Sequence, residues 1–224
     1  LLLAEPFPED AETLEPRKLN GYEIASRLSY FLWSSMPDSQ LLDLAMKKKL
    51  SDEKVLVSQV DRMLKDPRSK AFINHFSRQW LGLDGIHSVA VNPEYFPNFD
   101  DAMKDKMIEE TVATFDYVIS ENRSCLELID SEELVINSQL AAYYDIPGVA
   151  GKHFRPVKLD PTNPRGVLLS QASVLTLNSS GDDTHPVKRG VWVLERLLGD
   201  PPPPPPPGVP TIDEINDEAQ HLSL

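Results

Sequence analysis

The residues best suited to chemistry lie between 178 and 190, where a glycine-containing polar loop leads into a helix that begins at Pro186. The free N–H groups at a helix N-terminus favour an anion. Lys188 and Arg189 place two positive charges in the first turn, where the helix dipole disfavours them. We therefore expect both cations to have an anionic partner, either an internal carboxylate or an anionic ligand. His185, directly before the helix, could add a neutral imidazole at the same place.

Other catalytic and metal-binding patterns do not occur in the sequence. The five histidines are not within ligand spacing of one another, and there is no G-x-S-x-G, H-E-x-x-H, P-loop or G-x-G-x-x-G segment. Cys125 is the single cysteine, so these residues hold no C-x-x-C-H haem attachment site. We expect no metal site, no cofactor within these residues and no complete catalytic constellation, which leaves open whether the parent protein is an enzyme.

Two further groups of residues have plain structural interpretations. Cys125 has apolar neighbours, which predicts a buried structural thiol. Asp101, Asp105 and Glu109 share one face of a predicted helix without a histidine beside them. That pattern is typical of a solvated face and not of a metal centre.

The net charge of −13 is concentrated at the two ends of the chain. Residues 1–16 and 211–224 hold nine acidic residues and no Lys or Arg, which leaves −4 for the rest. We find no basic stripe, so nucleic acid is disfavoured as a partner. The longest apolar stretches are well short of the ~20 residues that cross a bilayer, so the sequence predicts no membrane span.

Helical patterns dominate residues 20–146, and the fold class predicted is all-α, an irregular multi-helix array. Capping and proline signals predict helices that begin after residues 20, 38, 51 and 66, a long helix over 100–120, and short helices near 126–129 and 138–144. Apolar residues at helical spacing predict the core of this array. These residues are Leu28, Phe31, Phe72, Phe76, Trp80, Ile108, Val112 and Phe115.

The pattern of residue types changes near residue 148, where Pro147 and Gly148 interrupt the helical periodicity. A short extended segment is expected over 154–159. Residues 167–177 fit a helix, although their Val and Thr content permits a strand. A helix then runs over 186–198. Our predicted organisation is an acidic linker (1–19), a helical domain (20–147), a second, smaller helical module (148–200), and a polyproline spacer with an acidic tail (201–224).

Seven consecutive prolines at 201–207 predict a stiff polyproline II rod of about 22 Å. We interpret it as a spacer that leads to a further module, and the chain as a fragment. The alternative is a ligand for an SH3- or WW-like groove.

Five segments carry a resemblance to a known family. They are YEIASRLSYFLWSSMPD (22–38), MLKDPR (63–68), QWLGL (79–83), RGVLLSQASVLT (165–176) and PVKRGVWVLERLLG (186–199). The chain resembles two adjacent helical modules of planctomycete-type exported proteins of unknown function, which are associated with cytochrome c haem sites of the C-x-x-C-H kind.

The resemblance implies export to the periplasm, a c-type haem in the full-length parent, and a role in electron transfer or oxidation outside the cytoplasm. The implied partner is a neighbouring haem-containing module, to whose propionates Lys188, Arg189 and His185 could offer contacts. The alternative function is a non-catalytic scaffold or an envelope polysaccharide-binding module. A C-x-x-C-H motif shortly beyond Leu224 would favour the redox role.

Overall fold

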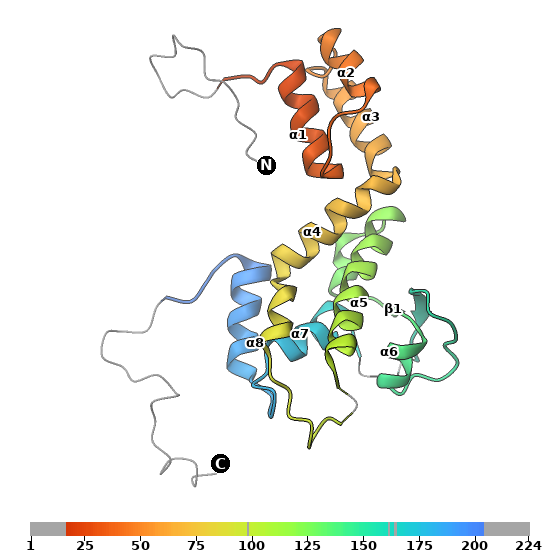
Figure 1. The fold of residues 1–224 in the computed structure, drawn as a ribbon, viewed down its shortest axis with the longest axis vertical. Coiled ribbons are helices and arrows are strands. Elements are labelled where there is room, and N and C mark those ends of the chain that lie inside the picture. The colour runs from red at the N-terminus through yellow and green to blue at the C-terminus, as the bar shows by residue number, and fades with distance from the viewer. Residues whose placement is uncertain (1–16, 98, 161, 164, 204–224) are drawn as a thin grey trace. The chain divides into compact units, whose positions relative to one another are not determined.

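The computed structural model describes residues 17–97, 99–160, 162–163 and 165–203, and it is mainly helical with one small sheet (Figure 1). The predicted all-α class is confirmed. The chain divides into two compact units, Leu1–Thr184 and His185–Leu224. The acidic linker and the proline spacer with its tail fall largely on residues 1–16 and 204–224, which lie outside the described residues. The boundary near residue 148 stays a prediction.

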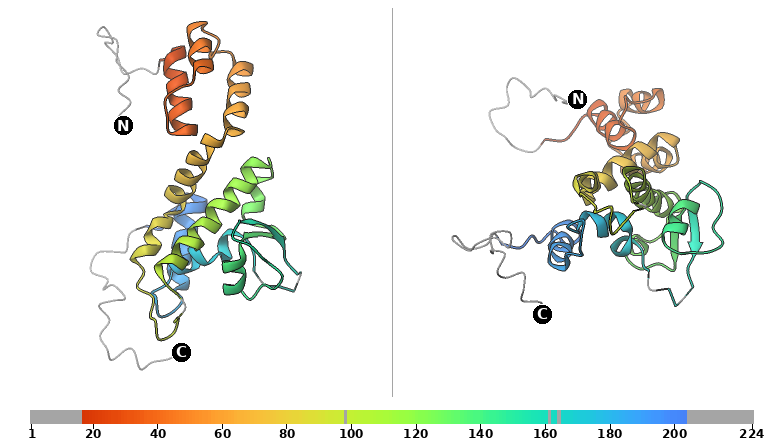
Figure 2. Two further views of the ribbon diagram at one scale, coloured as in Figure 1. Left: turned by 45° about the vertical axis from the view of Figure 1, so that its right-hand side comes forward. Right: turned by 60° about the horizontal axis from the view of Figure 1, so that its bottom comes forward.

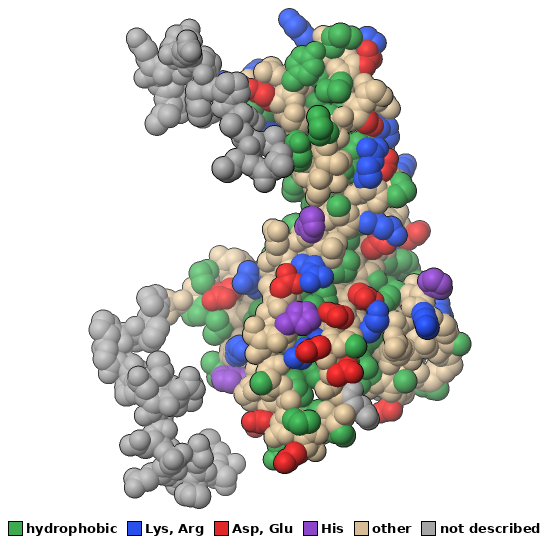
Figure 3. Space-filling view, viewed as in Figure 1, with side chains coloured by type: hydrophobic (Ala, Val, Ile, Leu, Met, Phe, Trp, Pro, Cys, Tyr) green, Lys and Arg blue, Asp and Glu red, His purple; other side chains and the backbone are tan. Residues whose placement is uncertain are grey.

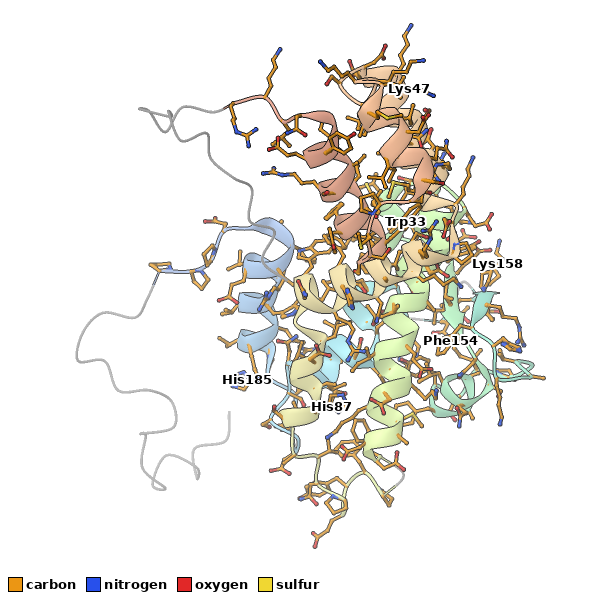
Figure 4. The ribbon with its side chains drawn as sticks, turned by 45° about the horizontal axis from the view of Figure 1, so that its top comes forward. Trp33, Lys47, His87, Phe154, Lys158 and His185 are labelled. Atoms are coloured by element: carbon orange, nitrogen blue, oxygen red, sulfur yellow. The ribbon has the colours of Figure 1, made fainter. Side chains whose placement is uncertain are left out.

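The first three helices pack around one apolar cluster. Their bounds are α1 Gly21–Trp33, α2 Ser39–Met46 and α3 Glu53–Leu64. Asn20 forms the predicted capping box with Glu23, and Asp38 caps α2. Trp33, at the end of α1 (Figure 4), donates from Nε1 to the Met63 carbonyl at 3.0 Å. This buried hydrogen bond connects α1 to α3.

Helices α4 (Lys70–Leu81) and α5 (Asp101–Ser120) lie side by side in both views of Figure 2. The 3₁₀ turn η1 (Pro67–Ser69) precedes α4 and has proline at its first position, as expected. Gly82 ends α4 with φ 68°, a left-handed conformation that glycine adopts without steric cost. A second 3₁₀ segment, η2 (Leu83–Ser88), follows directly.

A two-stranded antiparallel sheet follows α5 and the short η3 (Cys125–Leu128). Strand β1 (Glu133–Ile136) pairs with β2 (Arg155–Lys158), with Leu134 opposite Val157. Helix α6 (Ser138–Tyr143) lies between them in sequence. The extended segment over 154–159 was predicted, whereas β1 was not. Its last three residues are all buried, so the strand lacks the alternation that reveals a half-exposed strand.

Residues 167–177 are helical, which resolves the helix-or-strand ambiguity. They form η4 (Leu168–Ser170) and α7 (Ala172–Leu177), and α7 packs against α5 and η2 within the first unit. In the second unit, α8 (Pro186–Val193) continues as a π-helical turn, η5 (Leu194–Leu198), and ends at Gly199. This agrees with the predicted helix over 186–198.

The predicted core is only partly correct. Ile108 and Phe115 are 2% exposed, but Phe31 is 61% exposed and Phe76 40% exposed, so their assignment to the core was wrong. The remaining predicted residues, Leu28, Phe72, Trp80 and Val112, are partly buried.

The stripe of α4 that is buried lies one residue further along the helix. It consists of Ile73, Ser77 and Leu81, which are 0–1% exposed. Ser77 satisfies its hydroxyl by donating to the Ile73 carbonyl at 2.7 Å, so a small polar residue is tolerated there. The aromatic residues Phe72, Phe76 and Trp80 were predicted to be core because they recur at helical spacing, but they lie at the edge of the core.

Candidate functional site

The three predicted site residues lie together at the start of α8 (Figure 4 labels His185). His185 is the N-cap residue, and its Nδ1 accepts a hydrogen bond from the Lys188 backbone N–H at 3.3 Å. The imidazole therefore satisfies one of the free N–H groups that an anion would need. Lys188 and Arg189 each take part in further interactions. The proposed anion contact stays a prediction.

The loop before α8 owes its glycine to close packing within the first unit. Gly181 has φ 92°, and a Cβ atom there would lie 1.9 Å from the Ala90 carbonyl oxygen. Its own carbonyl accepts from Asn92 N–H at 3.2 Å. The glycine is thus explained without a bound ligand.

The acidic face of α5 is exposed and paired with nearby cations. Asp101 contacts Lys104 at 3.1 Å, and Glu109 contacts Lys106 at 2.6 Å. Asp105 lies 3.5 Å from His87. Among the described residues, no group of three or more His, Cys, Asp or Glu is arranged to hold a metal ion.

The described surface likewise offers no single-sign patch on the face shown in Figure 3, where acidic and basic side chains are interspersed over the first unit. None of the described helices has the length and apolar character needed to span a bilayer.

A buried carboxyl is the most unusual group in the first unit. Glu110, on α5, is fully buried, and its Oε2 accepts from the Tyr144 hydroxyl at 2.5 Å. Its other oxygen, Oε1, has no hydrogen-bond partner among the described residues. Burial raises the pKa of Glu110 to about 8, against smaller opposing effects of Tyr144 and Arg165. The carboxyl is therefore mostly protonated at neutral pH.

Tyr144 connects this carboxyl to helix α7. Its hydroxyl oxygen accepts from the Ala172 N–H at 3.1 Å, and the Arg165 guanidinium stacks over its ring at 4.0 Å. Burial and the Glu110 carboxyl both raise the pKa of Tyr144, so the phenol stays neutral. The three groups form a chain that runs from α5 through the end of α6 to the start of α7.

Hydroxyl and amide groups extend the chain along the same helix pair. Gln171 accepts from Thr111 Oγ1 at 2.8 Å and donates to Thr114 Oγ1 at 3.0 Å. Thr111 also lies 2.7 Å from the Ser173 hydroxyl. All of these side chains are buried, so the cluster is a structural network and has no access for a substrate.

An accessible groove in the first unit is lined by aromatic and aliphatic side chains. Its volume is about 400 Å³, and its lining includes Phe76, Trp80, Phe115 and Cys125. The ring centroids of Trp80 and Phe115 are 5.9 Å apart and nearly perpendicular. Asn122 and Arg123 supply polar groups to the same groove. We refer to it as the aromatic groove.

The prediction that Cys125 is a buried structural thiol is wrong, because the thiol is exposed. The apolar neighbours that suggested burial, Leu126 and Ile129, are themselves 72% and 45% exposed. In η3 only Leu128 turns inward, since a single short 3₁₀ turn buries one side and leaves the rest in solvent.

One exposed serine–histidine pair also occurs. Ser34 Oγ lies 3.3 Å from His75 Nδ1, and Ser34 has φ 52°. Within the described part of the chain, no carboxylate is hydrogen-bonded to His75, and the pair does not line the aromatic groove. A nucleophile needs an oriented base and an oxyanion site, so this contact does not form a catalytic triad.

Sequence reasoning missed Glu110, although a signal was present. The residue lies three positions after Met107 and four before Thr114, within the buried stripe of α5. An acidic residue in such a stripe predicts a perturbed carboxyl. Its partner Tyr144 is 34 positions further along the chain, and spacing gives no indication of this contact.

Two family models match the chain. The first is PSD4, described as a protein of unknown function (DUF1592), over residues 19–146, which is more than half of the 224 residues. The second is PSCyt3, described as a protein of unknown function (DUF1588), over residues 165–223. Neither a curated protein nor a solved structure matches the chain. The chain therefore belongs to the DUF1592 family and carries a DUF1588 segment C-terminal to that match.

Proposed function

We propose that the chain is a helical platform of an exported polypeptide that carries c-type haem elsewhere, and that it supports electron transfer or oxidation outside the cytoplasm. The observation that carries the proposal is the tandem order of the DUF1592 and DUF1588 matches, the two modules that the sequence resembles. The side chains are compatible with a platform that binds a neighbouring module: the Glu110 carboxyl is buried in the core, and the aromatic groove is open at the surface.

Covalent haem does not fit the chain itself. Attachment of c-type haem uses two cysteines and a histidine in one short motif, and Cys125 is the only cysteine. It lies in η3, in a turn without a histidine. The proposal therefore assigns the haem to a neighbouring module and derives no step through it.

A haem stain and a visible absorption spectrum of the full-length parent test this proposal. A covalent c-type spectrum supports it, and a haem-free parent overturns it.

Lys188 and Arg189 are proposed to offer positive charge to the haem propionates. Changing both to Ala should then lower the reduction potential, by about tens of millivolts at low salt. Changing the exposed Lys47 and Lys49 to Ala removes the same charge elsewhere and serves as the control.

A second candidate function, polysaccharide binding, is favoured by the aromatic groove. Aromatic faces beside amide and guanidinium groups suit a sugar strand, whose rings present both C–H faces and hydroxyls. Phe76→Ala should weaken glycan binding at least tenfold. Phe96→Ala is a matched control, because Phe96 is 43% exposed, similar to Phe76 at 40%, and does not line the groove. Equal losses in both variants, or no binding by the wild type, would exclude this function.

A further inference from the structure

The chain from Glu110 through Tyr144 to Ala172 joins parts of the molecule that belong to different family segments. Glu110 and Tyr144 fall within residues 19–146, whereas Ala172 falls within residues 165–223. All three lie in the same compact unit. This contact, like the hydrogen bonds that Gln171 forms with Thr111 and Thr114, joins the two segments in the core, and neither segment can make it alone.

Helix α7 depends on this contact at its N-terminus. Its N-cap residue, Gln171, makes no side-chain capping hydrogen bond, because its amide is engaged with Thr111 and Thr114. The Tyr144 hydroxyl accepts from the first helical N–H instead. An N-cap hydrogen bond stabilises the start of a helix, and α7, with six residues, has few intrahelical hydrogen bonds of its own, so it relies on this contact.

In the part of the chain that the structure describes, no positively charged group is hydrogen-bonded to the Glu110 carboxyl, which accepts from Tyr144. The ionisable groups that face Glu110 are Tyr144, at the end of α6, and Arg165, before η4, whose guanidinium stacks on the tyrosine ring. From α7 and its N-cap come only neutral groups, including Gln171 and Ser173. A charge on Glu110 would thus be buried with a single neutral donor and one unpartnered oxygen.

We propose that Glu110 is a proton-controlled latch, which holds Tyr144 and the start of α7 in the core while protonated and releases residues 165–177 from α5 when it loses its proton. Ionisation favours any conformer in which water reaches the carboxylate. Displacement of α7 is such a conformer, because α7 packs directly against α5. The latch makes the connection between the two family segments sensitive to pH.

The magnitude follows from proton linkage. Glu110 has a pKa of about 8 in the closed state and an ordinary carboxyl value of 4.5 once hydrated. The population of the opened state should therefore rise by up to about tenfold per pH unit between these values and level off above about pH 8. Below pH 4.5 the carboxyl is protonated in both states and the latch has no pH dependence.

Amide hydrogen exchange of the whole chain, divided by the intrinsic exchange rate at each pH, tests the latch. Protection of α7 should fall by up to about tenfold per pH unit from pH 5 to 8, and more steeply than that of α2. Glu110→Gln should abolish the fall, whereas Glu109→Gln, at the exposed neighbouring position, should retain it.

Protection of α7 that does not change with pH, or a fall that persists in Glu110→Gln, would overturn the proposal. So would equal falls in α7 and α2, which would indicate global unfolding. That comparison uses the wild type alone and decides the question even if Glu110→Gln does not fold.

Discussion

Tyr144→Phe removes one oxygen atom from the core and leaves two buried groups without a partner. Tyr144 is 6% exposed, and its hydroxyl both donates to Glu110 and accepts from Ala172 N–H. Each unsatisfied buried group costs about 1–3 kcal/mol. We therefore expect the free energy of unfolding to fall by about 2–6 kcal/mol, although the ring and its packing are unchanged.

Urea unfolding at constant pH, followed by far-UV circular dichroism, measures this loss. With a slope of about 2–3 kcal/mol per M, the midpoint should decrease by about 1–3 M at unchanged slope. Tyr143→Phe is the matched control, because Tyr143 is 37% exposed and has no such pair of hydrogen bonds. A decrease below about 1 kcal/mol, or equal losses in both variants, would refute the role assigned to the Tyr144 hydroxyl.

Three other predictions follow from local geometry. Gly181→Ala should lower the free energy of unfolding by about 1–3 kcal/mol or more, because φ is 92° and the new Cβ would clash with a backbone carbonyl. Gly190→Ala is the control: Gly190 lies in a helix with open space around it, so the change should be neutral or stabilising. Ile73→Ala should cost about 2–5 kcal/mol in chemical denaturation, and Phe76→Ala less, since Ile73 is 1% exposed and Phe76 40%. The pKa of Glu23 is lowered to about 2 by hydrogen bonds from Arg17 and from a backbone N–H. Its contribution to stability is therefore complete above about pH 4.5 and is lost as the pH falls towards 2. NMR titration of Arg17→Ala should show a higher pKa for Glu23.

Local sequence signals determined most of the helical fold. Asn20 and Asp38 define helix starts through short-range hydrogen bonds, and Gly82 defines a helix end through its positive φ. Such signals act within a few residues, so they can be read without knowledge of the tertiary structure. The family segments were recognisable for the same reason, as runs of residues in one order.

Only the tertiary structure decided which side of each element is buried and which residues that side contacts. The stripe of Ile73 and Ser77 is covered because neighbouring helices approach it, while the larger Phe76 stays at the edge. Strand β1 exists because β2 pairs with it across 18 intervening residues. Glu110 has a raised pKa because α5 carries it into the buried core, where, among the described residues, a tyrosine 34 positions away is its only hydrogen-bond donor. These properties depend on desolvation and on contacts between distant residues, and the order of residues along the chain does not specify them.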